Sequence, residues 1–552
     1  MTDTADGKRP WTKRYDPHVP PSVNIPEVFI HESLEHDARS FPNRLGLGFF
    51  GNNITFAEFD SLAGKFASSL LRLGVREGDR VVVHLPNIPQ YPISLYGVLK
   101  IGAASIGCSI LYKTPELVHL LNDSGAETIV TLDSSLPTIM EVKGRTKLRN
   151  VIATGLGDFI ALGKKMRESR SKPTKSDYHS YLRLIEQEEN LSTRLKGDPK
   201  NTPALIQYTG GTTGVPKGVV LTHYNLLANM TQVKIWAALE YGEDSTLSVF
   251  PFFHQAGQIF LLMSVHLAAT QVLYPNPRDL FMAVQLIGER KPTIIAAVPT
   301  WYILLLRSPY ARKCDFSGVK LFISGAAPFP AEQINEFKRA TGKELIEVYG
   351  LTEASPLITV NPFYGRKKVG SVGLPLPNTD VKLLDIENGK EVEVGKPGEL
   401  VTKGPQVMVG YLNQPDETAK TLRDGWLYTG DVATMDGDGY FYIVDRTKDM
   451  INVSGYKVFP REVDEVITTH EAVSVAATVG IPNPDRPGSE IVKSFIVLRD
   501  GYAPSDELKE EIEKFLKDRL ATFKVPRIVE FRKELPLTLI GKVLKRALRD
   551  GQ

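Results

Sequence analysis

Three short apolar runs, each followed at once by a turn of glycine or other small residues, constrain the fold of this chain most strongly. The runs are KPTIIAAVPT, VKLFISGAAP and KELIEVYGLTE, and each has the pattern of a buried strand that stops at a tight turn. Earlier, Thr55 and Glu58 have the spacing of a helix capping box, and residues 80–86 form an apolar run closed by proline. This alternation predicts an α/β fold whose ligands bind beyond the carboxyl ends of the strands.

The length of the chain predicts more than one domain. A chain of 552 residues is too long for a single hydrophobic core. From Gly398 the pattern changes to short β runs with turns, and the last segment contains an amphipathic helix that Ser505 can cap. We therefore expect a large N-terminal α/β domain over residues 1–445, ending in a β-rich subdomain, and a small α+β C-terminal lid domain over residues 446–552.

The charge balance and the cysteines argue against two classes of protein. Lys and Arg number 66 and Asp and Glu number 64, so the basic excess of a nucleic-acid-binding protein is missing and no nucleic-acid partner is expected. Cys108 and Cys314 lie far apart and form no CxxC pair. A disulfide framework is therefore not expected, and a reducing, cytoplasmic location is.

One uncharged stretch of the sequence has nearly the length of a membrane span. The N-terminus lacks the apolar stretch of a secretory signal. Residues 256–274 carry no charge and have nearly the length of a membrane span, but Gln258, His266 and Gln271 would be costly in lipid. We predict a buried helix and strand there and no transmembrane segment. Peripheral membrane contact stays open, for example through the basic residues 164–177, which we expect to form a solvated loop.

The sequence YTGGTTGVPKG, residues 208–218, lies between two apolar strands. Its glycines let backbone N–H groups face an anion, its threonines add hydroxyl donors, and Lys217 adds a positive charge. It is no Walker A motif, because Val215 and Pro216 separate Gly214 from the lysine. A hairpin loop rich in turn formers is the alternative. The density of glycine, threonine and lysine favours a site for nucleotide phosphates.

Three further residue patterns indicate chemistry, each with a structural alternative. Thr352 and Glu353 follow an apolar strand, so the hydroxyl can contact a phosphate and the carboxylate can bind Mg²⁺, unless Glu353 simply faces solvent. Asp431, in GWLYTGD, can accept hydrogen bonds from both ribose hydroxyls, or it is a turn residue. His254 lies among aromatic residues in FPFFHQAG, where a histidine with a structural role in the core is the alternative to a site residue.

Five motifs stand in the order found in the adenylate-forming enzymes, and the resemblance covers about residues 29–549. They are YTGGTTGVPKG, YGLTE, GWLYTGD, DRTKDMINVSGYKVFPREVDEV and GKVLKRALR. This superfamily contains acyl- and aryl-CoA synthetases, nonribosomal-peptide adenylation domains and firefly luciferase. The opening KRPWTKRYDPHVPPSVNIP and the length are most similar to prokaryotic long-chain fatty acid–CoA ligases. The resemblance implies an acid–thiol ligase: a carboxylic acid and ATP give acyl-AMP and pyrophosphate, and coenzyme A then displaces AMP.

The resemblance also implies roles for individual residues. Adenine would lie between the turn SGAAP at residues 324–328, for which a plain strand-end turn is the alternative, and Tyr349. Catalytic roles fall to Thr212, Glu353 and Lys542, and Mg²⁺ would bind Glu353 and Thr209. The implied ATP and AMP site comprises Thr209, Gly210, Gly211, Thr212, Thr213, Gly214, Lys217, Gly325, Ala326, Ala327, Pro328, Tyr349, Gly350, Thr352, Asp431, Arg446 and Lys542.

The resemblance also implies an acyl site in the N-terminal domain and a coenzyme A site on the lid domain. The acyl group would contact Phe253, His254 and Gly325, in a pocket expected from residues 250–257, 298–302 and 325–326. The lid would be mobile and turn about the hinge residue Lys448. It would present Lys542 for adenylation, and then Gly455 and Lys457 for binding of coenzyme A.

Several alternatives remain at this stage. The chain could be an aryl-, medium- or short-chain acyl-CoA ligase, or an acyl-AMP ligase that loads a carrier protein. A P-loop phosphotransferase or a non-catalytic nucleotide-binding protein is disfavoured, because the Walker A motif is missing and both Glu353 and Lys542 are present. The expected ligands are ATP, Mg²⁺, coenzyme A as a substrate and a small carboxylic acid. Whether the protein is a monomer or a homodimer stays open.

Overall fold

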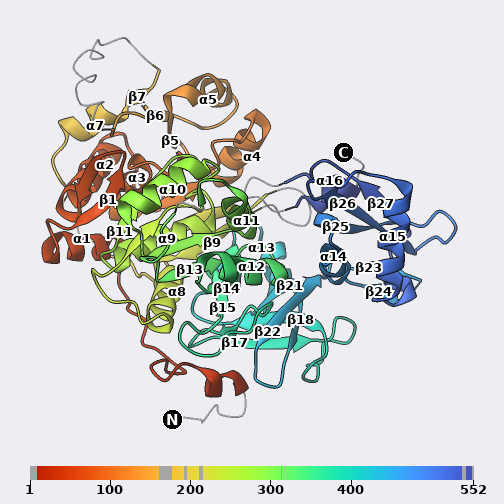
Figure 1. Ribbon diagram of the computed structural model, residues 1–552. Coiled ribbons are helices and arrows are strands. Elements are labelled where there is room, and N and C mark those ends of the chain that lie inside the picture. Colours follow the sequence, from red (N-terminus) through yellow and green to blue (C-terminus); the bar gives the residue numbers. More distant parts are fainter. Residues whose placement is uncertain are drawn as a thin grey trace.

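The computed structural model describes residues 9–160, 177–191, 195–209, 216–311, 314–454, 456–537 and 543–549. Except for Asp177, the basic stretch 164–177 lies outside the described residues. The structure consists of helices layered with parallel and mixed sheets, followed by a β-rich part and a small α+β part (Figure 1). The predicted α/β class is confirmed.

The candidate site lies at one edge of a sheet that has nine strands within the described residues. Its central strands are parallel, and its edge strands β2, β15 and β16 pair in antiparallel fashion. The three predicted apolar runs form the neighbouring strands β12, β13 and β14. In spatial order the strands are β16 (Leu374–Pro375), β15 (Leu357–Val360), β14 (Leu345–Gly350), β13 (Leu321–Ser324), β12 (Ile294–Ala297), β10 (Ser245–Leu247), β11 (Thr270–Val272), β1 (Leu45–Phe49) and β2 (Asn52–Thr55).

A second sheet has eight strands in the described part of the chain and carries both ends of the glycine-rich loop. The predicted strand after the capped helix is its strand β3. The spatial order is β19 (Gly410–Tyr411), β9 (Lys217–Thr222), β8 (Pro203–Thr209), β4 (Ala104–Gly107), β3 (Arg80–His84), β5 (Thr128–Leu132), β6 (Asn150–Thr154) and β7 (His179–Ser180).

Helices cover these two sheets, and their ends follow the predicted local signals. At the predicted capping box, the Glu58 backbone N–H donates to Thr55 Oγ1 at 3.2 Å and the Thr55 N–H donates to Glu58 Oε2 at 2.8 Å. The helices are η2 (Pro10–Arg14), α1 (His31–Ser40), α2 (Phe56–Arg72), α3 (Gln90–Lys100), α4 (Thr114–Ser124), η3 (Asp133–Ser135), α5 (Leu136–Lys143), α7 (Tyr181–Gln187), α8 (His223–Trp236), α9 (Gln255–His266), α10 (Leu280–Arg290), α11 (Pro299–Arg307), α12 (Ala331–Thr341), η5 (Thr352–Ala354) and α13 (Pro415–Thr421).

The uncharged stretch 256–274 folds as predicted, because it contains most of the buried helix α9 and the short strand β11. Residues on every side of α9 are buried, which explains why the stretch resembles a membrane span in composition. Among the helices that the structure describes, none is long and apolar enough to cross a membrane.

The β-rich part is a set of antiparallel strands that contains Asp431. Asp436 and Asp438 lie in the hairpin between β21 and β22, and both carboxylates accept hydrogen bonds from Lys368 Nζ, at 2.6 and 2.7 Å. The strands are β17 (Asp380–Leu384), β18 (Gly398–Lys403), β20 (Leu422–Arg423), β21 (Trp426–Met435) and β22 (Phe441–Arg446).

The C-terminal part has a hydrophobic core of its own, which includes Val463, Ile496 and Leu516. Its elements group at one side of the molecule, in blue in Figure 1. Ser505 caps α15 as predicted, by accepting the Leu508 N–H at 3.1 Å. A boundary between Asp445 and Arg446 stays a prediction. The elements are β23 (Ile451–Val453), β24 (Tyr456–Val458), α14 (Pro460–Thr468), β25 (Val473–Pro482), β26 (Glu490–Leu498), α15 (Asp506–Lys517), η6 (Thr522–Lys524), β27 (Ile528–Phe531) and α16 (Lys545–Arg549).

Candidate active site

A polar cluster, buried at Tyr349 and Asp431, joins the end of β14 to the β-rich part. The Tyr349 hydroxyl donates a hydrogen bond of 2.7 Å to Asp431 Oδ2, and Arg446 Nε lies 3.0 Å from Asp431 Oδ1. The register of β21 and β22 pairs Asp431 with Arg446 directly. Burial raises the pKa of Tyr349, and the negative charge of Asp431 adds to this rise. The alternative of Asp431 as a turn residue is wrong, because this residue lies within β21 and is only 4% exposed.

The turn SGAAP follows β13 directly and lies beside the end of β14. Ala326 has φ of +68°, so the chain reverses there in the left-handed conformation. A Cβ atom on Gly325 would lie 2.7 Å from Val348 Cγ2, so any larger residue at this position requires Val348 to shift. The plain strand-end turn of the alternative interpretation is present, and a flat ring against it stays a prediction.

Glu353 lies on η5 and is held by β19. The Tyr411 hydroxyl donates to Glu353 Oε1 at 2.9 Å, and the Met408 N–H donates to the Glu353 carbonyl oxygen at 2.8 Å. Burial raises the pKa of Glu353, whereas a backbone N–H and the Tyr411 hydroxyl lower it in part. The charges of Arg446 and Asp431 also act on this carboxylate, so Glu353 belongs to the same electrostatic environment as the polar cluster.

Lys217, the lysine of the glycine-rich loop, begins β9 and is 9% exposed. Its Nζ lies 2.5 Å from Glu417 Oε2 and 5.3 Å from the centre of the Tyr411 ring. Lys420 donates to the other oxygen of Glu417, at 2.7 Å. The hydrogen bonds from Lys217 and then Lys420 lower the pKa of Glu417 to about 2. Tyr411 therefore lies between Lys217 and Glu353 and contacts both.

The two strands that flank the glycine-rich loop form an antiparallel pair, with Thr209 opposite Lys217. This pairing agrees with both interpretations of the loop, the hairpin and the phosphate site. Several predicted site residues lie outside the described part of the chain: Gly210, Gly211, Thr212, Thr213, Gly214, Gly455 and Lys542.

The structure thus brings together residues from motifs that lie far apart in the sequence. Tyr349, Glu353, Asp431 and Arg446 act on one another, and Tyr411 links Glu353 to Lys217. Sequence reasoning missed Tyr411 and Glu417. No periodicity or motif marks them, because their role depends on the pairing of β19 with β9.

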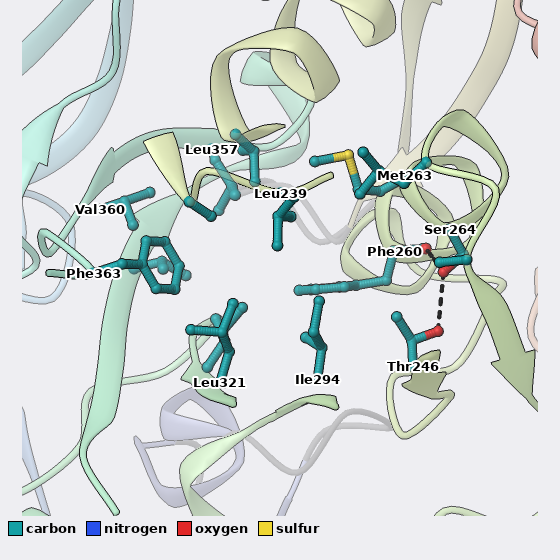
Figure 2. Close-up of a pocket in the computed structure, with 16 residues that line it drawn as sticks. Leu239, Thr246, Phe260, Met263, Ser264, Ile294, Leu321, Leu357, Val360 and Phe363 are labelled. Atoms are coloured by element: carbon teal, nitrogen blue, oxygen red, sulfur yellow. Dashed lines mark hydrogen bonds between the residues drawn. The ribbon is translucent and has the colours of Figure 1, made fainter. Parts of the chain in front are cut away.

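An apolar cavity of about 40 Å³ lies next to this cluster, between the nine-stranded sheet and helices α8 and α9 (Figure 2). Val348, which precedes Tyr349 on β14, lines it together with Ile323 and Leu357. The lining residues are Val233, Ala237, Leu239, Thr246, Phe260, Met263, Ser264, Leu267, Ala269, Ile294, Leu321, Ile323, Val348, Leu357, Val360 and Phe363.

The predicted acyl-contacting residues Phe253 and His254 are not among the described residues that line this cavity. His254 is the N-cap of α9, and its Nδ1 accepts the Ala256 N–H at 3.2 Å. This hydrogen bond caps the helix, and the predicted contact of His254 with the acyl group stays a prediction. Gly325 is not among the described lining residues either, although a Cβ atom added to it would lie 2.7 Å from Cγ2 of the lining residue Val348.

Two predicted lid residues lie in exposed positions. Lys457 Nζ pairs with Glu387 Oε1 of the β-rich part at 2.7 Å. Lys448 follows β22 by two residues, and its side chain is exposed. Neither position tests the predicted coenzyme A contact or the predicted hinge.

Comparisons with known proteins agree with these features. The sequence profile of the AMP-binding enzyme family matches residues 34–412, and that of the AMP-binding enzyme C-terminal domain matches residues 462–542. The chain is 39% identical to a long-chain-fatty-acid–CoA ligase of Bacillus subtilis, over 99% of this chain and 98% of that protein. A ligase of the same name from Yersinia pestis is also 39% identical, over 98% of each chain. The structure resembles ATP-bound MatB from Rhodopseudomonas palustris, with a TM-score of 0.86 and 27% identity, over 95% of this chain and 99% of that one.

Proposed function

Because the chain belongs to the AMP-binding enzyme family, we propose that it is an ATP-dependent ligase that joins a long-chain fatty acid to coenzyme A. The carboxylate attacks the α-phosphorus of ATP, which forms acyl-AMP and releases pyrophosphate. The thiol of coenzyme A then attacks the acyl carbon, which forms the thioester and releases AMP. The relatives from Bacillus subtilis and Yersinia pestis, which share the chain over nearly its whole length, carry this activity in their names.

One observation carries the proposal: Val348 and Tyr349, neighbours on β14, face an apolar cavity and a polar cluster respectively. Successive side chains of a strand point to opposite faces. An acyl-AMP lying across the carboxyl ends of β13 and β14 would therefore place its acyl chain on the side of Val348 and its nucleotide on the side of Tyr349. Ligands of open α/β sheets bind at these strand ends.

The polar cluster supplies groups suited to a nucleotide. A carboxylate oxygen has two acceptor sites, so Asp431 can keep Tyr349 and Arg446 as donors and still accept from both ribose hydroxyls. Adenine would lie against the turn SGAAP and beside the ring of Tyr349. Lys217 and Lys542 would neutralise phosphate charge as negative charge builds up in the transition state, and the Thr212 hydroxyl would donate a hydrogen bond.

A bound Mg²⁺ would be held by Glu353 and Thr209. Mg²⁺ in nucleotide sites takes one or two protein oxygens and completes its shell with phosphates and water, and this donor set fits that pattern. Tyr411 fixes the direction of the Glu353 carboxylate by its hydrogen bond at 2.9 Å. The ion would supply charge neutralisation at the phosphates.

The lid over residues 446–552 would serve the two half-reactions in turn. In this proposal it turns about Lys448, bringing Lys542 to the phosphates first and Gly455 and Lys457 to coenzyme A afterwards. Lys457 would then exchange its pairing with Glu387 for a contact with coenzyme A. The free thiols Cys108 and Cys314 fit a cytoplasmic location for this chemistry.

The first half-reaction provides the test. Exchange of labelled pyrophosphate into ATP should depend on an added fatty acid and should not require coenzyme A. A panel from acetate to octadecanoate, with benzoates and cinnamates, then locates the preferred acid. Exchange without any acid, or a preference for acetate or cinnamate over fatty acids, would contradict the proposal.

A further inference from the structure

The register of the parallel strands defines one end of the apolar cavity, which we call its floor. Thr246 on β10 pairs with Ile294 on β12, and Ile294 pairs with Leu321 on β13. These three residues all line the cavity and lie in one row, near the amino ends of their strands. Figure 2 shows them side by side along one side of the cavity. Val348, beside Gly325, lies at the opposite, carboxyl ends.

The strand rise gives the depth of the cavity. Leu321 precedes Gly325 by four residues, so the row lies about 13 Å from the turn at roughly 3.3 Å per residue. An extended alkyl chain advances about 1.25 Å per carbon, for bonds of about 1.5 Å at an angle of about 111°. A straight acyl chain whose carboxyl end lies at Gly325 therefore reaches the row after about ten carbons.

A pair of hydroxyl groups closes this end of the cavity. Ser264 Oγ donates to the Phe260 carbonyl oxygen at 2.7 Å, and Thr246 Oγ1 lies 2.9 Å from Ser264 Oγ. Since the Ser264 proton is already used, Thr246 is the donor of this second bond. The bond joins β10 to α9 across the floor and is drawn in Figure 2. Both hydroxyls thus have partners, and an aliphatic chain end can pack against them without leaving a polar group unsatisfied.

We propose that Thr246 determines the acyl-chain length that this enzyme accepts, an inference that rests on the proposed function. A straight chain of about ten carbons reaches the floor row, so the longer chains of the proposed function must displace its side chains or bend. The cavity of about 40 Å³ has room for about three water molecules, so binding also requires lining side chains such as Met263 to move.

The test is the ratio of kcat/KM for dodecanoate to kcat/KM for hexanoate, because a general loss of folded enzyme lowers both values equally. Thr246→Leu extends the floor into the cavity and should lower the ratio by about tenfold or more, the scale for misfit of one or two methylene groups. Thr246→Ala deepens the cavity, leaves the bond from Ser264 to Phe260 intact, and should raise the ratio.

Thr246→Val is the matched control, since it keeps the shape of the side chain and removes the hydroxyl. Its ratio should stay close to that of the unmodified enzyme. An unchanged ratio in both the leucine and the alanine variants would overturn the inference, and so would a shift in the valine variant as large as that of leucine. An unmodified enzyme that forms no acyl-AMP from any acid would instead overturn the proposed function.

Discussion

The hydroxyl of Tyr349 donates a buried hydrogen bond of 2.7 Å to Asp431, which stands opposite Arg446 in the neighbouring pair of strands. The two partners approach Asp431 at different oxygens, Oδ2 and Oδ1. The carboxylate is therefore fixed in direction before any nucleotide arrives. Binding of a ligand that adds two hydroxyl donors therefore costs little conformational entropy in this side chain. This low entropy cost is the physical advantage of a preorganised site.

Asp431→Asn should weaken the use of ATP. The amide lacks the charge and one acceptor oxygen, and a hydrogen bond to a charged group contributes about 1.5–3 kcal/mol, so kcat/KM for ATP should fall by about 10- to 100-fold. The same assay on Glu391→Gln, a change at an exposed carboxylate of the β-rich part, provides the control. An unchanged KM for ATP in Asp431→Asn would exclude the ribose contact.

Lys217→Ala should slow the formation of acyl-AMP by about 100-fold, the scale for loss of one electrostatic stabiliser of the transition state. Lys420→Ala is a closely matched control, because Lys420 pairs with the same Glu417 but has a side chain that is 69% exposed. Rapid-quench measurement of acyl-AMP distinguishes the two residues. Equal losses in both variants would indicate that only the pairing with Glu417 matters.

Tyr411→Phe should shift the acid side of the pH profile. Glu353 must be ionised to bind a metal ion, and its pKa is already raised by burial, so metal binding is lost as the pH falls through that value. The hydrogen bond from Tyr411 lowers this pKa, and its removal should raise it again. The acid limb of kcat/KM should therefore move to higher pH, and more Mg²⁺ should be needed for half-maximal activity.

Tyr364→Phe is the control for this shift, since Tyr364 is 67% exposed and its hydroxyl donates only to a backbone carbonyl. A Tyr411→Phe enzyme with an acid limb at the original pH would refute the coupling between Tyr411 and the metal ligand.

Gly325→Ala should impair long acids more than short ones. The added Cβ would lie 2.7 Å from Val348 Cγ2, so Val348 must move, and this side chain lines the cavity. Overpacking typically costs about 1–3 kcal/mol. We therefore expect the ratio of the turnover of hexadecanoate to that of butyrate to fall by about tenfold. Gly318→Ala, where a Cβ would meet no atom within 4 Å, should leave the ratio unaltered. A parallel loss for both acids would mean that Gly325 serves only the nucleotide or the fold.

The sequence predicted the strand ends of this site better than it predicted the residues that contact Glu353 and Lys217. Apolar runs followed by small residues predicted the positions of β13 and β14, because the tight turn that ends each strand has a recognisable local composition. Tyr411 and Glu417 left no such signal, since their contacts with Glu353 and Lys217 arise from the antiparallel pairing of β19 with β9.

The sequence also did not predict the position of the apolar cavity. The pocket expected from residues 250–257, 298–302 and 325–326 shares no described lining residue with this cavity, which lies along the later turns of α9, at Phe260, Met263 and Ser264. Because α9 is buried on every side, its pattern of apolar residues cannot tell which face borders a cavity and which face packs against neighbours.

The central claim is that ATP is cleaved between its α- and β-phosphates to activate an acid for transfer to coenzyme A. The most direct measurement identifies the products formed from ATP, hexadecanoate and coenzyme A by chromatography and mass spectrometry. We expect AMP, pyrophosphate and hexadecanoyl-CoA in equal amounts, and acyl-AMP on the enzyme when coenzyme A is omitted. Formation of ADP and phosphate, or of thioester without AMP, would contradict the account.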